Sequence, residues 1–228
     1  MAEERDFATR AVFLDALGTL IELDPPWVHL REFVPDRIDD ETLIRAVRAE
    51  MAYYRAHAHE GRDQASLADL RRRCAELISR ELGSEISVEQ LLSSVVFAAY
   101  PDASPALADL REQRLKLIVV SNWDVSLETV LERCGLASLL DDVVSSAAAG
   151  VAKPDPAIFE VALELADCEP GEALHVGDTP EEDIEGARAA GIRALLIDRD
   201  GRRRARTRSR GAAVDSHIAS LSEISEHL

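Results

Sequence analysis

Polar side chains that could act together lie in four segments spread across most of the chain. In order, these segments supply Asp15, then Ser121 with Asn122, then Lys153, and then Asp178 with Asp183 five residues beyond it. Asp15, Ser121 and Asp178 each follow a short apolar run, the pattern of a strand buried in a parallel sheet. Ligands of such sheets collect where the carboxyl ends of the strands meet, so we expect these groups to converge at one edge.

The chemistry that suits this set of residues is phosphoryl transfer. A carboxylate such as Asp15 can attack phosphorus and hold the phosphoryl group covalently, which divides one difficult step into two. Attacker and substrate are both anions, and a Mg²⁺ ion held by oxygen ligands would offset their repulsion. We expect Asp15 and Asp178 to supply two of those ligands and the backbone carbonyl of Leu17 a third.

The remaining polar groups would handle the phosphate. Lys153 would pair with the phosphate and with the nucleophile, while Ser121 and backbone amides would donate hydrogen bonds to phosphate oxygens. Asp183 would orient Lys153 or a metal-bound water. Asn122 and Trp123 lie next to Ser121 and are expected to contact the substrate. Taken singly, a Ser or Asp after a strand is usually a helix cap or a turn residue, so the joint order is what favours a shared site.

These segments, in this order, resemble the motifs of the haloacid dehalogenase superfamily of hydrolases. The resemblance rests on Asp15-Ala-Leu-Gly-Thr-Leu, Ser121-Asn122, Lys153-Pro154 and Gly177-Asp178-Thr-Pro-Glu-Glu-Asp183. The helical block directly after the first motif resembles the cap of the subgroup with small α-helical caps. The resemblance implies an aspartyl-nucleophile hydrolase, most often a Mg²⁺-dependent phosphatase acting on a small phosphorylated metabolite.

Leu17 departs from the pattern of that superfamily. Its phosphatases generally carry a second Asp two residues after the nucleophile, as general acid and base, and an isobutyl group cannot carry a proton. General acid–base help contributes about 10²–10⁴ in rate, so its loss should matter most for alkyl phosphates and least for anhydrides or acyl phosphates. Asp24, His29 and Asp124 are the candidates for a substitute proton carrier.

Two alternatives to a phosphatase therefore stay open. Halide displacement, the reaction that names the superfamily, needs no acid and no metal. A phosphate- or partner-binding domain without turnover needs neither. The acidic pair Asp178 and Asp183 favours phosphate chemistry over halide displacement.

The residues between the motifs show two different patterns of predicted secondary structure. Residues 23–100 show helical spacing and no strand-like run, which indicates an inserted all-helical cap domain. Residues 1–22 and 101–228 alternate strands with helices, which indicates an α/β core with a doubly wound parallel sheet. The expected core strands are 11–14, 115–120, 143–144, 173–176 and 192–197, and the expected helices are 105–113, 127–134, 157–166, 181–190 and one from Ile218 onward. His175, inside one of these strands, is expected to be buried and hydrogen-bonded.

The amino-acid composition limits which partners the protein could bind and where in the cell it would be found. A net charge of −17 and an aromatic content of 4% argue against broad binding to nucleic acid or to an anionic membrane. The three cysteines have no CxxC spacing, and no secretory or membrane-spanning segment is apparent, so we expect reduced, buried thiols and a cytoplasmic protein. Residues 199–210 hold seven Arg and are expected to form an exposed loop, with a patch that binds nucleic acid or an anionic partner as the alternative. Substrate identity and oligomeric state stay open.

Overall fold

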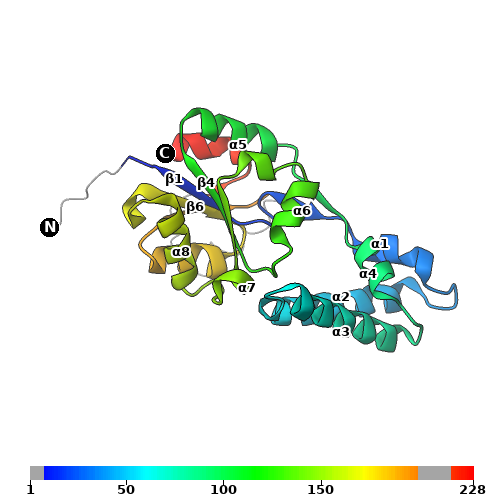
Figure 1. Ribbon diagram of the computed structural model, residues 1–228. Helices are drawn as coiled ribbons and strands as arrows, with labels where there is room; N and C mark the ends of the chain where they lie inside the picture. Colours follow the sequence, from blue (N-terminus) through cyan, green and yellow to red (C-terminus); the bar gives the residue numbers. More distant parts are fainter. Residues whose placement is uncertain (1–7, 200–216) are drawn as a thin grey trace.

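The computed structural model describes residues 8–199 and 217–228. A six-stranded sheet with the strand order β5-β4-β1-β6-β7-β8 forms its centre, and every neighbouring pair is parallel (Figure 1). The strands are β1 (Ala11–Leu14), β4 (Lys116–Ser121), β5 (Asp142–Ser145), β6 (Ala173–Gly177), β7 (Arg193–Ile197) and β8 (His217–Ile218). The expected doubly wound α/β fold is confirmed.

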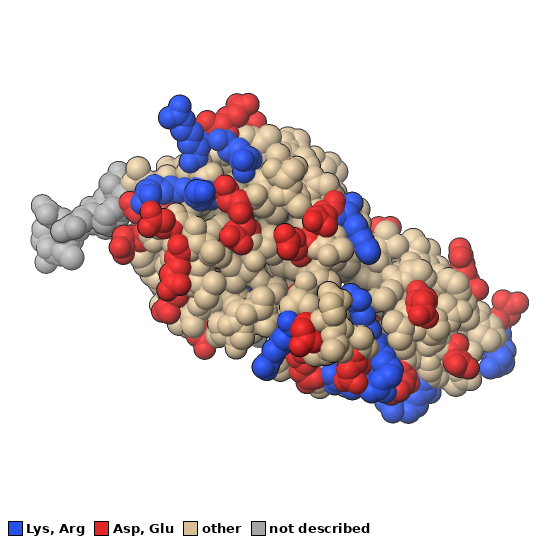
Figure 2. All heavy atoms as spheres, viewed as in Figure 1, with Lys and Arg blue, Asp and Glu red and all other residues tan. Residues whose placement is uncertain are grey.

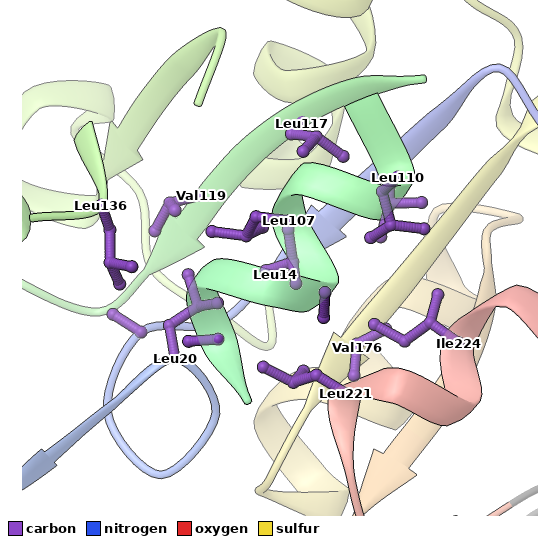
Figure 3. Packing of buried hydrophobic residues seen from close by; sticks show 14 of the residues in the cluster. Leu14, Leu20, Leu107, Leu110, Leu117, Val119, Leu136, Val176, Leu221 and Ile224 are labelled. Carbon is purple, nitrogen blue, oxygen red and sulfur yellow. The ribbon is translucent and has the colours of Figure 1, made fainter. Parts of the chain in front are cut away.

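Helices cover both faces of this sheet, which explains why its central strands are continuous apolar runs. On one face Leu14, Val119 and Val176 pack against α5, α6 and the C-terminal 3₁₀ helix η6 (Figures 1 and 3). On the other face Phe13 and Ile118 pack against α8 and the segment that leads into α9. The covering elements are α5 (Ala103–Glu112), α6 (Leu127–Arg133), α7 (Ser146–Ala149), α8 (Ala157–Ala166), α9 (Gly186–Ala189) and η6 (Leu221–His227).

Between β1 and β4 the chain forms a separate group of helices at one end of the molecule (Figure 1). These helices are α1 (Pro26–Leu30), α2 (Asp40–His57), α3 (Gln64–Leu82) and α4 (Val88–Ser94), and they share a buried cluster of their own. Asp39, Asp63 and Ser87 cap the N-termini of α2, α3 and α4 with their side chains. Gly83 ends α3 in the left-handed conformation, with a φ of +60°.

Three expectations about secondary structure are wrong in detail. The block 23–100 contains a strand, β3 (Phe97–Ala99), which pairs antiparallel with β2 (Ile21–Leu23) where the chain enters and leaves the helical group. Ile218 ends strand β8, and the helix that follows it is 3₁₀. The expected helix 181–190 is a π-helical turn, Pro180–Glu185, followed by the single turn α9. Each of these segments is too short to leave a periodic pattern.

Acidic and basic side chains alternate over the face of the molecule shown in Figure 2. On α3, for example, Arg72 pairs with Asp69 and Glu76.

Of the segment 199–210 with its seven Arg, only Arg199 falls within the described residues. Cys74 is buried as expected, whereas Cys134 and Cys168 are partly exposed. Within residues 8–199 and 217–228, none of the helices has both the length and the apolar character required to cross a bilayer.

Candidate active site

Asp15, Ser121 and Lys153 meet at the carboxyl edge of the sheet and are all buried. The Ser121 hydroxyl donates to Asp15 Oδ1 at 2.9 Å, and the Lys153 ammonium donates to the same oxygen at 2.7 Å. The carboxylate of Asp178 lies close by, because oxygens of Asp15, Asp178 and Asp183 fall within 4.8 Å of one another. The structure thus brings together the groups that were expected to converge.

Sheet register explains this convergence. Leu14 at the end of β1 pairs with Val119 in β4 and with Val176 in β6, so three strands end at nearly the same level. The backbone N–H of Asp15 continues the ladder by donating to the Val176 carbonyl at 2.9 Å. Residues just beyond these strands must therefore share one edge.

Two glycines let the acidic segments approach closely. A Cβ on Gly18 would overlap the Asp178 carboxylate, and the φ of +89° at Gly18 also disfavours any other residue. A Cβ on Gly177 would overlap the side chain of Asp183. The side chains of Asp178 and Asp183 occupy the space that these absent Cβ atoms leave.

Asp183 is the second carboxylate that binds the Lys153 ammonium. Its Oδ1 accepts from Lys153 Nζ at 2.5 Å and lies 3.1 Å from His175 Nε2, while Oδ2 accepts from the Thr179 N–H at 2.8 Å. His175 is buried and hydrogen-bonded, as expected, and its ring packs edge-on against Phe159 at 5.0 Å. The sequence did not reveal that Asp183 is the partner of His175, because that contact joins a strand to a later turn.

Burial and charge shift the pKa values of this cluster in opposite directions. Burial, followed by the charges of Asp183 and Asp178, raises the pKa of Asp15 to about 7, although Lys153 opposes the shift. Burial disfavours the charged form of Lys153, but Asp15 and Asp183 outweigh it and raise the pKa of the lysine. Burial also opposes ionisation of Asp183, but Lys153 and His175 hold the pKa of this acid well below its usual range. Burial lowers the pKa of His175, which favours the neutral ring.

The donor set fits a divalent cation. Three carboxylates face one ammonium group, so the cluster carries excess negative charge, and oxygen ligands are those that Mg²⁺ prefers. Both oxygens of Asp183 are engaged, with Lys153, His175 and Thr179. The hydrogen bonds to Asp15 and the Thr179 hydroxyl bond to Asp178 all reach Oδ1, so we expect Asp15 and Asp178 to be the better pair of ligands. Leu17 lies in the turn after Asp15, and a ligand supplied by its backbone carbonyl does not depend on which side chain the residue carries.

The two expected substrate contacts next to Ser121 lie in different surroundings. The Asn122 carboxamide bonds to the backbone N–H and carbonyl of Lys153 and to Glu182. Trp123 is 6% exposed and packs against Phe97 of β3, with ring centroids 5.2 Å apart. Little of its surface is therefore left for a ligand in this conformation.

The candidates for a substitute proton carrier also fall into two places. Asp24 Oδ2 lies 3.5 Å from His29 Nε2 near the surface, with Asp24 before α1 and His29 within it. Asp124 is 2% exposed, and its carboxylate accepts hydrogen bonds from the Tyr54 hydroxyl at 2.7 Å and from the Ser126 N–H at 2.6 Å. Asp124 thus connects the loop after β4 with helix α2, a contact that no pattern in the sequence indicated.

Comparison with known proteins places these observations in a family. A model of haloacid dehalogenase-like hydrolases matches residues 9–191. Haloacid dehalogenase-like hydrolase domain-containing protein 3 of Bos taurus is 47% identical over 95 residues, 42% of this chain and 38% of that protein. The phosphoserine phosphatase of Thermus thermophilus is 36% identical over 129 residues, 56% of this chain and 50% of that protein. The matched regions span less than two thirds of either relative's length.

The fold gives the same assignment over nearly the whole chain. A solved HAD phosphatase from Thermococcus onnurineus superposes with a TM-score of 0.68 at 25% identity, covering 96% of this chain and 97% of that one. The family model spans most of the chain, from just before β1 to just before β7. The chain therefore belongs to the haloacid dehalogenase-like hydrolases.

Proposed function

We propose that this hydrolase is a Mg²⁺-dependent phosphatase that acts on a small phosphorylated metabolite through an aspartyl-phosphate on Asp15. The observation that carries the proposal is the double contact to Asp15 Oδ1, made by Ser121 at 2.9 Å and by Lys153 at 2.7 Å. Two donors on one oxygen hold the carboxylate in a fixed orientation, which prepares its other oxygen, Oδ2, for attack.

The proposed reaction has two displacement steps. Asp15 Oδ2 forms a bond to phosphorus while the bond from phosphorus to the leaving oxygen breaks, and that oxygen keeps the electron pair. A water molecule then attacks the phosphorus of the acyl phosphate, which releases inorganic phosphate and restores the Asp15 carboxylate. Ser121 and Lys153 donate to the phosphoryl oxygens as charge builds on them. Bound Mg²⁺, held by Asp15, Asp178 and the Leu17 carbonyl, would supply the positive charge that lets two anions meet.

The helical group formed by α1–α4 would act as a cap over this edge of the sheet. Its two connections to the core, β2 and β3, pair with each other, and the loop after β4 contacts it through Asp124. Substrate choice would then depend on the cap, while the core supplies the chemistry.

Leu17 should affect which leaving groups the enzyme can expel, because it cannot protonate the leaving oxygen. The proposed mechanism favours substrates whose leaving oxygen is already a stable anion, such as acyl phosphates and phosphoanhydrides. The phosphoserine phosphatase relative is named for an alkyl phosphate. If this chain also hydrolyses such esters, a group other than residue 17 must protonate the alcohol.

A panel of phosphate esters, anhydrides and 2-haloacids, assayed with Mg²⁺ and with chelator, tests the proposal. We expect phosphate release that disappears with EDTA and returns when Mg²⁺ is added in excess. Halide release that is insensitive to EDTA would instead support the dehalogenase alternative. Leu17 is compatible with that reaction, because halide displacement needs no general acid. Phosphate binding without any turnover would support a non-catalytic domain.

A further inference from the structure

Asn122 makes an unusual set of contacts for a residue expected to bind substrate. Its Oδ1 accepts from the backbone N–H of Lys153 at 2.8 Å, and its Nδ2 donates to the carbonyl of the same residue at 2.9 Å. Nδ2 also donates to Glu182 Oε2 at 3.0 Å. One side chain thereby joins the segment after β4 to two other segments of the site.

The two bonds to Lys153 replace what secondary structure would otherwise provide. Lys153 lies in a turn, outside any helix or strand, and it is buried. A buried backbone N–H and carbonyl both need partners, and a carboxamide is the side chain that can serve both at once. The third bond reaches Glu182, whose neighbour Asp183 binds the Lys153 ammonium. Lys153 is therefore held at its backbone by Asn122 and at its ammonium by Asp15 and Asp183.

We propose that Asn122 is a positioning residue that clamps the backbone of Lys153, and that it does not bind the substrate. A carboxamide nitrogen has two hydrogens, and both are used by Lys153 and Glu182, so neither is left to donate to a phosphate or a halide. The inference rests on the proposed function only through the role of Lys153. A shift of about 1 Å in a positioned group can lower the rate about 10²-fold, so loss of the clamp should act on kcat.

The amino-acid composition allows a direct test that needs no activity. Asn122 is the only asparagine in the chain, so labelling with ¹⁵N-asparagine gives a single side-chain NH₂ pair in an NMR spectrum. We expect both protons of the native protein to exchange with solvent at least about tenfold more slowly than those of an unstructured peptide. Exchange as fast as in the peptide would overturn the clamp.

Lysine labelling tests the consequence for Lys153. The chain has two lysines, the exposed Lys116 and the buried Lys153, so Lys116 serves as an internal reference. Acetylation followed by peptide mapping should modify Lys116 first in the native protein. In Asn122→Ala, modification of Lys153 relative to Lys116 should rise at least about tenfold. Unchanged protection of Lys153 would show that Asn122 does not hold it.

Glu182→Gln is the matched control, since glutamine keeps an acceptor for Asn122 but removes the charge. We expect this variant to protect Lys153 as the native protein does. If it exposes Lys153 as much as Asn122→Ala does, the carboxylate charge and not the carboxamide holds the lysine, and the proposal is wrong.

Kinetics separate the clamp from a substrate contact. For Asn122→Ala we expect kcat to fall about 10²-fold while KM stays within about threefold. A rise in KM with kcat and Lys153 protection unchanged would identify Asn122 as a substrate ligand. If the native protein releases no phosphate from any substrate, the proposed function fails, but exchange and labelling still decide whether the clamp exists.

Discussion

The site around Asp15 and the contact between the cap and the core use similar polar groups but differ in how these are supported. At the site, Ser121 at the end of β4 and Lys153 in a later turn both donate to Asp15. The register of the strands fixes the position of Ser121, and bonds from Asn122 hold the backbone of Lys153. At the contact with the cap, the Tyr54 hydroxyl donates to Asp124 at 2.7 Å. There the backbone N–H of residue 125 also donates to the carbonyl of residue 61 at 3.0 Å.

We expect this difference to separate the rigidly held parts of the molecule from those held less firmly. Displacing Ser121 would require the sheet to change, and displacing Lys153 would require its bonds to Asn122, Asp15 and Asp183 to break. We expect the cap to be held less firmly, because the loop after β4 bonds to it through the Tyr54 hydroxyl and the carbonyl of residue 61. The chemistry should therefore be insensitive to changes in the cap, and access to the site should be sensitive to them.

The largest effect is expected for Asp15→Asn. The amide is a poor nucleophile, so phosphate release should fall by more than about 10⁴-fold while the circular dichroism spectrum stays native. Binding of phosphate, measured by calorimetry, serves as the control for an intact site. Activity within tenfold of the native protein would remove Asp15 from the mechanism.

A gain of up to about 10² in the rate of alkyl phosphate hydrolysis is expected for Leu17→Asp, because the new carboxylic acid can protonate the leaving alcohol. Acyl phosphate hydrolysis, which needs no such proton, should change little and is the matched measurement. An unchanged rate for alkyl phosphates would mean that another group, such as His29 or Asp124, already carries the proton.

Tyr54→Phe should weaken the contact between cap and core. The substitution removes the hydroxyl that donates to Asp124, so one oxygen of that buried carboxylate loses its hydrogen-bond donor. We expect the free energy of unfolding to fall by about 1–3 kcal/mol. We also expect KM to rise more than kcat falls. Tyr53→Phe is the matched control, because the Tyr53 hydroxyl accepts from Arg73 within the cap. Equal effects of the two variants on KM would contradict a specific role for the contact.

The smallest effect concerns a buried acid inside the cap. Glu50 is 8% exposed, and burial raises its pKa even though a hydrogen bond with Cys74 opposes the shift. Glu50 ionises freely in the unfolded state, but its burial disfavours ionisation in the native state. Glu50 therefore destabilises the native state increasingly as the pH rises through its unfolded and folded pKa values. Below about pH 4 the acid is protonated in both states and this destabilisation vanishes.

Glu50→Gln should therefore raise the free energy of unfolding by up to about 1 kcal/mol at pH 7.5 and change it little near pH 4. Urea unfolding at the two pH values measures this difference. Glu81→Gln, on the exposed side of α3, is the control and should show no dependence on pH. A gain of equal size at both pH values would show that charge is not the cause.

The sequence predicted the parts of the molecule that depend on local pattern. The apolar runs before Asp15, Ser121 and Asp178 located three strands of the sheet and the edge where they end. The sequence does not indicate strand β3, because three residues carry no detectable alternation, and it does not distinguish the π-helical turn 180–185 from an ordinary helix, because the segment is too short to show a period.

The contacts that support the site could not be read from the sequence. His175 with Asp183, Asn122 with Lys153, and Tyr54 with Asp124 each join residues that only tertiary packing brings together. In each case the spacing of the two residues in the sequence carries no signal of their contact. The sequence indicates which groups reach the edge of the sheet. It does not indicate the hydrogen bonds that fix those groups in place.

The most direct test of the central claim is chemical trapping of the intermediate during turnover. Borohydride added to a phosphatase reaction at steady state reduces an acyl phosphate to an alcohol, which mass spectrometry locates in the peptide map. We predict modification at Asp15 that requires both substrate and Mg²⁺. Sustained phosphate release with Asp15 unmodified, or with the modification on another residue, would contradict the account.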